Sequence, residues 1–293
     1  MGLSGWIHTA LRGVGFDIYH HMAGGRVVPF RIRSIPSVGP LRRDSGRFLG
    51  SFEVDIESCT SFPAFSYRNG GWNPHVATLE ELIRDPSLRY EDSSLCRLYE
   101  TFIPQTLQEL FLEDEGAPMR PLCDLPALRR LFRYVWAINP ALIRRGTAAE
   151  HEGTGHHYFG PMSPEKGQAQ FERLLRTFRS IEKEGFYPDR YGPVKGYFLA
   201  DESSYRYVVG SGNHRLAALK VLGYRTVRVG LTTSHPAVVH RSQLASWTIE
   251  EGGPFEPETA YALFDKLMTE DGMDKARNLG VVGPTTQVPF GTH

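Results

Sequence analysis

The chain has 293 residues, of which 41% are hydrophobic and 23% are charged. This composition excludes an intrinsically disordered chain and supplies enough apolar side chains for one large domain or two closely packed ones. The formal net charge is zero, so no overall field attracts DNA, RNA or an anionic membrane, and nucleic-acid binding would need a local basic patch.

The cysteine and hydropathy patterns predict a cytoplasmic protein. The three cysteines, Cys59, Cys96 and Cys123, lie far apart and give no CxxC spacing for zinc or thiol exchange, so a reducing compartment is the simplest expectation. No stretch approaches the roughly 20 apolar residues of a membrane-spanning helix. We therefore predict a soluble chain without a membrane span.

Residues 1–150 are predicted to be an N-terminal elaboration that sets the substrate. Apolar and polar residues alternate in pieces between residues 26 and 56, which is typical of short strands and turns. Residues 61–74 are rich in aromatic and turn-forming side chains. We expect a structural loop there, and a wall on which a sugar stacks is the alternative.

Three helices are predicted in the same region. Thr78, with Glu81 three residues later, indicates a capped helix over residues 78–84, and the others are expected over 93–99 and 125–136. The last helix and the residues after it carry five arginines: Arg129, Arg130, Arg133, Arg144 and Arg145. A solvated helix face is the commoner explanation for such a run. The alternative is a phosphate-binding patch, which would be the basic patch of a DNA-associated module.

Residues 151–235 are predicted to form a compact α/β module. It opens with a loop, residues 153–167, that contains glycines, two histidines and an acid–base pair. Apolar residues from Phe171 to Ile181 recur at helical spacing and predict an amphipathic helix. Two β-like runs between residues 196 and 209 then indicate a hairpin.

A glycine-containing turn follows the hairpin: Gly210-Ser211-Gly212-Asn213-His214-Arg215. A helix is expected after it over residues 213–222, and a strand over 226–229. A strand, a glycine turn and a helix direct free backbone N–H groups and the positive end of a helix dipole at an anion. The glycines allow close backbone approach and the last three residues add side-chain donors. The turn therefore predicts a phosphate site.

The remaining residues, 236–293, are predicted to be a C-terminal extension with a helix near Pro257–Thr269 and a loosely ordered tail.

The order of these elements resembles the ParB/sulfiredoxin superfamily. The resemblance rests on "LLRTFRSIEKEG" at residues 174–185, the hairpin, "VVGSGNHRLAALKVLGY" at residues 208–224, and "VRV" at residues 227–229. It covers about a fifth to a quarter of the chain and implies an α/β (α+β) fold with a small mixed sheet and packed helices. It also implies an ATP or CTP site at Gly212, Asn213, His214 and Arg215.

Differences from the superfamily pattern indicate which of its branches this chain resembles most. Sulfiredoxin-like members carry a reactive cysteine before His-Arg, where this chain has Asn213, so sulfinic-acid chemistry is not expected. Partition proteins carry a further arginine, where this chain has Leu216-Ala217, so DNA partitioning is disfavoured. The turn is most similar to the Gly-His-His-Arg of free-serine kinases. That similarity implies phosphoryl transfer from a nucleotide, with Mg²⁺, to a hydroxyl.

Candidate catalytic residues lie in the turn and in the loop before the first helix of the module. His214 and Arg215 are expected to neutralise phosphate charge, and Lys166 to contact phosphate. Glu165 is our first candidate for the base, with His156 or His157 as runners-up. The alternative is structural, because Ser163-Pro164-Glu165 also has the pattern of an N-cap followed by a first helical turn.

Three functions remain open. The leading hypothesis is a nucleotide-dependent phosphotransferase, an ATP-dependent kinase or nucleotide hydrolase, that acts on a small-molecule or glycan hydroxyl. The second is a ParB-like nucleotide-sensing or DNA-associated module without phosphoryl transfer, and the third is a scaffold that has lost nucleotide binding. The acceptor, the choice between ATP and CTP and the oligomeric state stay open.

Overall fold

The structure is a computed structural model. It describes residues 51–104, 106–111, 135–136, 157–232, 235–248 and 255–282, together with the backbone of residues 17–23, 26–32, 42–44 and 47–49. The predicted helix over residues 125–136 and its arginines, His156, Cys123 and the C-terminal tail therefore lie outside the described residues, except for Val135 and Trp136, which form a buried turn.

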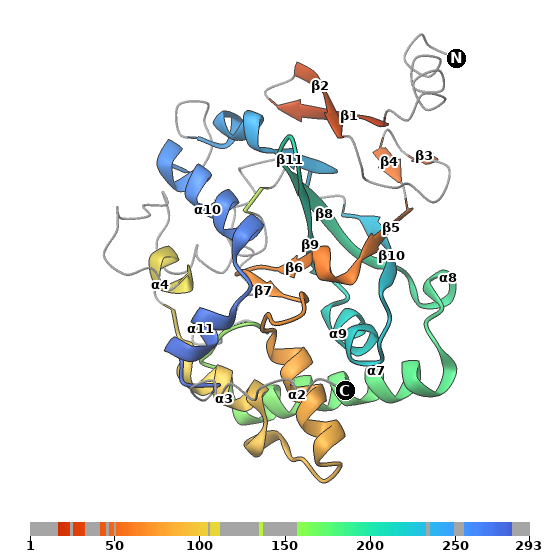
Figure 1. The fold of residues 1–293 in the computed structure, drawn as a ribbon, viewed down its shortest axis with the longest axis vertical. Coiled ribbons are helices and arrows are strands. Elements are labelled where there is room, and N and C mark those ends of the chain that lie inside the picture. Colours follow the sequence, from red (N-terminus) through yellow and green to blue (C-terminus); the bar gives the residue numbers. More distant parts are fainter. Residues whose placement is uncertain are drawn as a thin grey trace, which may run out of the picture.

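A seven-stranded mixed sheet is the centre of the fold (Figure 1). Its strands are β5 (Ser51–Asp55), β6 (Cys59–Ser61), β7 (Phe65–Ser66), β8 (Val194–Ala200), β9 (Tyr205–Ser211), β10 (Thr226–Leu231) and β11 (Val238–His240). The order is β5-β10-β8-β9-β6-β7. Strands β10 and β11 both pair in parallel with β8, at residues 194–196 and 198–200 respectively, so they follow one another along the same edge of β8. The mixed α/β class predicted from the sequence is confirmed.

The sheet takes strands from all three segments that the sequence distinguishes. β5 pairs antiparallel with β10, and β6 pairs in parallel with β9. Strands β1 (Asp17–Ala23) and β2 (Arg26–Ile32) form a separate antiparallel pair, as do β3 (Arg42–Asp44) and β4 (Arg47–Leu49). The expectation of short strands between residues 26 and 56 is confirmed.

The predicted hairpin is the antiparallel pair β8–β9, in which Tyr197 lies opposite Val208. Asp201 closes its turn, because its carboxylate accepts hydrogen bonds from the backbone N–H groups of Ser203 and Ser204, both at 2.7 Å. These bonds lower the pKa of Asp201 although its partial burial opposes them. A short side chain that binds the backbone two residues on is the usual stabiliser of such a turn.

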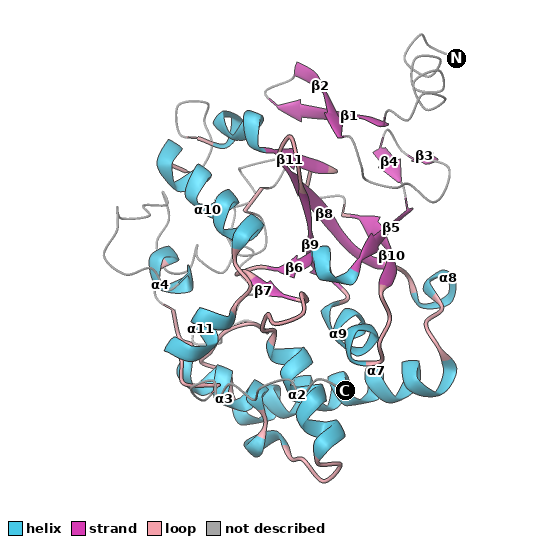
Figure 2. Ribbon diagram, in the orientation of Figure 1, coloured by secondary structure: helices cyan, strands magenta, loops and turns pink. Residues whose placement is uncertain are grey.

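Helices cover both faces of the sheet (Figure 2). They are α2 (Pro74–Arg84), α3 (Ser94–Thr101), α4 (Leu107–Phe111), α7 (Pro164–Glu184), α8 (Pro188–Tyr191), α9 (Asn213–Val221), α10 (Pro257–Thr269) and α11 (Met273–Asn278), with the 3-10 helices η1 (Ile56–Ser58), η2 (Tyr90–Asp92) and η3 (Arg241–Trp247). None of these described helices has the length and apolar content needed to cross a bilayer.

The two-residue period of the central strands creates two hydrophobic cores. Phe198 of β8 packs in one core with Tyr207 of β9 and with the apolar faces of α2, α7 and α9. Their chain neighbours Tyr197 and Val208 point into the other core, with α3, α10 and η3. Both faces of the central strands are therefore buried, and the architecture has three layers.

Helix α2 begins earlier than the sequence predicted. Asn73 is its N-cap and accepts a hydrogen bond from the backbone N–H of His75 at 3.0 Å, with Pro74 in the first turn. The prediction of Thr78 as the cap was wrong. The Thr78 hydroxyl lies inside the helix and accepts a hydrogen bond from the backbone N–H of Leu95 at 3.1 Å.

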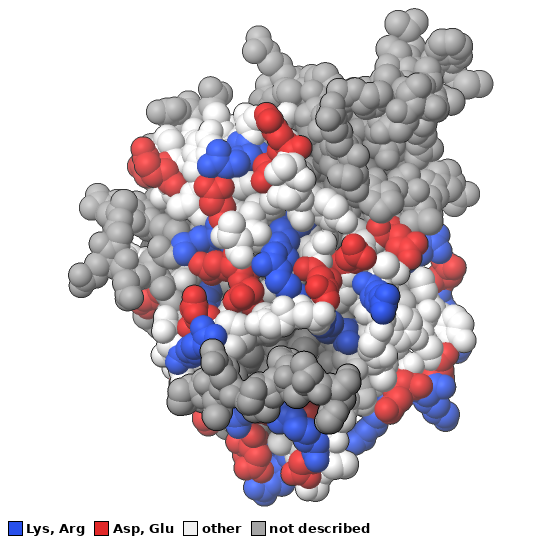
Figure 3. Space-filling model, viewed as in Figure 1, with Lys and Arg blue, Asp and Glu red and all other residues white. Residues whose placement is uncertain are grey.

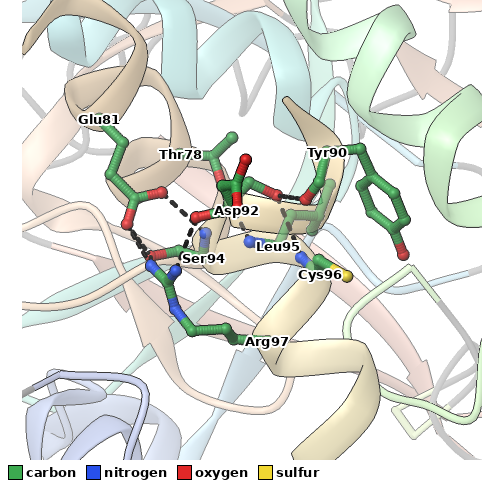
Figure 4. A network of polar contacts seen from close by, with 9 residues as sticks. Thr78, Glu81, Tyr90, Asp92, Ser94, Leu95, Cys96 and Arg97 are labelled. Carbon is green, nitrogen blue, oxygen red and sulfur yellow. Dashed lines mark hydrogen bonds and ion pairs between the residues drawn. The ribbon is translucent and has the colours of Figure 1, made fainter. Parts of the chain in front are cut away.

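Polar contacts bind α2 to α3 (Figure 4). The Glu81 carboxylate accepts hydrogen bonds from the backbone N–H and the hydroxyl of Ser94, both at 2.7 Å, and pairs with Arg97. Ser93 caps α3 by accepting a hydrogen bond from the Cys96 N–H at 3.2 Å, so the helix predicted over residues 93–99 is confirmed. Glu81 thus links two helices and does not form the predicted capping box.

The aromatic segment over residues 61–74 belongs to the core. Phe65, Tyr67 and Trp72 are all buried, and the Phe65 and Trp72 rings meet edge to face with centroids 5.2 Å apart. These rings are not available to stack on a sugar, so the structural interpretation holds for them. The buried Lys275 of α11 anchors the same region, because its ammonium donates to the Pro63 carbonyl oxygen at 2.7 Å.

Candidate functional site

The glycine turn joins β9 to α9 through a left-handed residue. Gly212 has φ 96° and is the residue before the first turn of α9, whose Leu216 N–H donates to the Gly212 carbonyl oxygen at 2.9 Å. A Cβ atom on Gly212 would lie 3.2 Å from Val194 Cα and 2.9 Å from Arg215 Nη2. Both the conformation and the lack of space require glycine here. Because the N–H groups of a first helical turn have no acceptor within the helix, those of residues 213–215 can bind an anion.

A cavity of about 590 Å³ opens beside this turn. Its walls are the turn, one face of α7, Gly185, Phe186, Tyr191 and His157. The basic side chains of the described lining are Arg173, Arg176, Arg215, His157 and His214, and no aspartate or glutamate lines the cavity with them. Such a lining favours an anionic ligand.

Helix α7 divides its residues between the cavity and the core. Gln170, Arg173, Thr177 and Ser180 line the cavity at spacings of three, four and three residues, which places them on one helical face. Phe171, Leu174, Phe178 and Ile181 are buried, as the predicted periodicity required. The Arg173 guanidinium lies close enough to His214 and Arg215 to lower the pKa of both, so three basic groups meet at this wall.

Arg215 is partly committed to holding the cavity wall. Its Nη1 donates to the Tyr191 carbonyl oxygen at 3.0 Å and also to the Gly192 carbonyl oxygen. Burial, and secondarily Arg173, lowers the pKa of Arg215, but a guanidinium stays protonated at neutral pH. Its charge therefore remains at the cavity while one of its nitrogens fixes the segment after α8.

His214 is a neutral base in this structure. Burial, and then the nearby charge of Arg173, lowers its pKa to about 4. Its ring meets the His75 ring edge to face with centroids 4.8 Å apart. His157 lines the same cavity, and its ring centroid lies 4.6 Å from that of Tyr158.

His75 lies behind the site, against His214, and the sequence reasoning missed it. It is fully buried in the first turn of α2, and neither ring nitrogen has a hydrogen-bond partner among the described residues. Burial, His214 and His157 together hold its pKa well below the usual range. The Asn-Pro-His order marks a helix start, but only the packing of α2 on α9 brings this ring to the glycine turn.

Asn213 forms part of the cavity floor. Its side-chain oxygen accepts a hydrogen bond from the Tyr67 hydroxyl at 3.2 Å, and both residues are buried. Burial raises the pKa of Tyr67, so its hydroxyl keeps the proton that it donates. The buried aromatic segment thus orients the first residue of α9.

The chain matches no protein-family model, no curated protein and no solved structure. The resemblance to the ParB/sulfiredoxin superfamily therefore rests on its sequence motifs alone. The structure shows where the residues of these motifs lie.

The predicted site residues fall into two groups. Gly210, Ser211, Gly212, Asn213, His214, Arg215 and His157 line the one cavity. Glu165 lies in the exposed first turn of α7 and borders a different cavity with Tyr90 and Glu100. Hydrogen bonds from its own backbone and from Ser163 lower the pKa of Glu165, and Lys166 follows it on the exposed surface. Ser163, Pro164 and Glu165 thus form the N-cap and first turn of α7, which is the structural alternative to a catalytic role for Glu165.

The cavity fits the two implied cofactors unequally. Its cations and the free N–H groups of α9 suit the phosphates of ATP or CTP. Magnesium prefers carboxylate oxygens, and the described lining offers none. Nor does any cluster of three or more His, Cys, Asp or Glu with metal-binding geometry occur in the part of the chain that the structure describes. A divalent ion here would be held by the nucleotide's own phosphates.

Proposed function

We propose that this protein is a nucleotide-dependent phosphotransferase that uses ATP or CTP and acts on a small-molecule or glycan hydroxyl. The observation that supports this most is the cavity at the β9–α9 turn, where a helix N-terminus faces three arginines and no described carboxylate. Phosphoryl transfer depends mainly on positioning and on neutralising charge around the phosphates. The lining supplies the groups for both.

The nucleotide would enter with its phosphates toward the glycine turn. The N–H groups of residues 213–215 would bind the innermost phosphate oxygens, and Arg173 and Arg176 would bind those nearer the mouth. Phe186 and Tyr191 line the same cavity and offer aromatic surfaces for the base. The hydroxyl substrate would then approach beside His157.

A neutral imidazole is the base that fits this proposal. His214 is unprotonated at neutral pH because of its burial and Arg173, and it lines the cavity together with His157. Either ring could accept the proton of the attacking hydroxyl. Glu165 has no part in this proposal because it borders the other cavity.

A turnover assay with ATP, CTP and GTP, Mg²⁺ and a panel of sugars and small hydroxyl compounds tests the proposal. We expect one acceptor to raise nucleotide consumption and to become phosphorylated. Replacing the base, by His157→Gln or His214→Gln, should lower kcat about 10²- to 10⁴-fold, whereas Glu165→Gln should leave kcat unchanged. Transfer that depends on Glu165 and on neither histidine would refute the assignment of the base.

A nucleotide-binding module without transfer is the second candidate. The observation that favours it is the described lining itself, which lacks a carboxylate to serve as a base or to hold a metal ion. Nucleotide binding without consumption in the presence of every acceptor would establish this candidate.

Both candidates are expected to act in a reducing cytoplasm, since Cys59 and Cys96 carry free, buried thiols.

DNA association has less support on the surface that can be seen. Figure 3 shows basic and acidic side chains interspersed over that face, with no gathered basic patch among the coloured residues. The five arginines considered for such a patch lie outside the described residues. Retention on DNA that weakens steeply with salt would revive this function.

A further inference from the structure

A second cavity, of about 840 Å³, lies at the opposite end of β9 and α9 from the glycine turn. Tyr205 and Arg206 of β9 line it, whereas Gly210 and Ser211 of the same strand line the first cavity. Helix α9 likewise begins at the first cavity and reaches the second with Lys220. The two cavities therefore share two secondary-structure elements but none of their lining residues.

Arg206 is a buried cation without a bonded carboxylate. Its side chain is 3% exposed, its Nε donates to the Met268 carbonyl oxygen at 3.0 Å and its Nη1 to the Glu57 carbonyl oxygen at 2.9 Å. Both acceptors are neutral, and Nη2 has no partner among the described residues. Burying a charge is costly unless a counter-charge lies near it.

The other charged groups of this cavity do not supply that counter-charge in full. Lys220 and Glu57 pair with each other at 3.7 Å. Arg68 and Arg225 are exposed on the lining and form no ion pair within the described part of the chain. Asp55 is the remaining acid of the described lining, so three arginines face one carboxylate and leave an excess of two positive charges.

We propose that this cavity binds the phosphate group of a small molecule, separately from the nucleotide. A phosphate monoester carries a charge of roughly −1.5 to −2 at neutral pH, which matches the excess of the lining. Arg68 and Arg225 contact the phosphate oxygens from the rim, since guanidinium groups bind such oxygens bidentately. Arg206 contributes its charge from the floor, where the low dielectric strengthens the attraction.

The test is a titration of ¹⁵N-labelled protein with inorganic phosphate, followed by amide chemical shifts. We expect one set of shifts at Asn69 and Gly223, beside the second cavity, in addition to any set at Gly212 and Asn213. In the double variant Arg68→Ala/Arg225→Ala, the phosphate affinity measured from the shifts at Asn69 and Gly223 should fall at least about tenfold, since two charge-assisted contacts are removed. Both side chains are exposed, so the variant should fold.

Two controls keep this proposal distinct from the proposed function. Arg179→Ala, an exposed arginine that lines neither cavity, should change neither set. Arg173→Ala should weaken only the set at the glycine turn. Shifts at the turn alone, or at neither place, would overturn the second site. The proposed function is tested separately by ATP binding and turnover, so shifts at Asn69 and Gly223 without any response to ATP would overturn it and leave the second site standing.

Discussion

His214 owes its neutral state to its surroundings. Its folded-state pKa of about 4 lies below the usual value of 6.5 because the ring is buried beside His75 and feels the charge of Arg173. Between pH 6.5 and pH 4, His214 is protonated in the unfolded chain but stays neutral in the folded protein. The contribution of this residue to stability is therefore complete above pH 6.5 and is lost as the pH falls toward 4.

This linkage predicts a measurable difference between wild type and His214→Gln. The wild-type free energy of unfolding should fall by about 2 kcal/mol more than that of the variant between pH 7 and pH 5. Urea denaturation at both pH values measures this difference. His235, whose pKa is also lowered by burial, titrates alike in both proteins and cancels, and so does the larger effect of burial on His75. Equal losses in the two proteins would show that His214 is protonated in the fold near its usual pKa.

Some residue assignments could be made from the sequence and others could not. The glycine turn was found because its local pattern of strand, glycine and helix carries its own physical reason. Glu165 was expected beside that turn, but it borders another cavity than Gln170 and Arg173 of the same helix, because successive residues of a helix face different directions. His75 has no motif, and its place depends on the packing of α2 against α9.

At the scale of the element, α9 is bounded by two left-handed glycines that offer a matched comparison. Gly212 precedes the helix at φ 96° and Gly223 follows it at φ 81°. A Cβ on Gly223 would meet no atom within 4 Å, whereas one on Gly212 would meet Val194 and Arg215. The two positions share the backbone strain and differ in the space available.

Gly223→Ala should cost about 1 kcal/mol of stability, from the left-handed conformation alone. Gly212→Ala should cost at least about 1 kcal/mol more, because β8 and the Arg215 guanidinium must move, and it should also remove nucleotide binding. Thermal or urea unfolding of both variants, with calorimetric titration of ATP, measures the two effects. Equal stability losses with binding retained would contradict the close packing of the turn against Val194.

At the scale of the whole molecule, pairing between distant segments determines what the sequence could not predict. The helix over residues 257–269 and the β8–β9 hairpin were predicted because their signals are local. The pairing of β5 with β10 joins residues about 170 positions apart, and no local pattern specifies such a partner or its register. The sequence predicted the hairpin β8–β9 and the strand β10, but it did not predict that β5, β6 and β7 join them in one sheet.

The three-layer arrangement explains why the cavity is preorganised. The central strands are buried on both faces, and α7 and α9 pack on the same core. The polar face of α7 is thereby held opposite the glycine turn, with Arg173 near His214 and Arg215. A rigid scaffold of this kind would let a few side chains bind the phosphates of the proposed nucleotide without first being ordered.

Calorimetric titration of ATP, with Mg²⁺, into the wild type, Arg173→Ala and Arg179→Ala tests the central claim most directly. Both substitutions remove an exposed arginine of α7, but only Arg173 lines the cavity. We predict that Arg173→Ala weakens ATP binding at least about tenfold, because it removes a charge-assisted phosphate contact, and that Arg179→Ala binds like the wild type. Equal weakening in both variants, or no binding of ATP, CTP or GTP by the wild type, would contradict the claim that this cavity binds nucleotide phosphates.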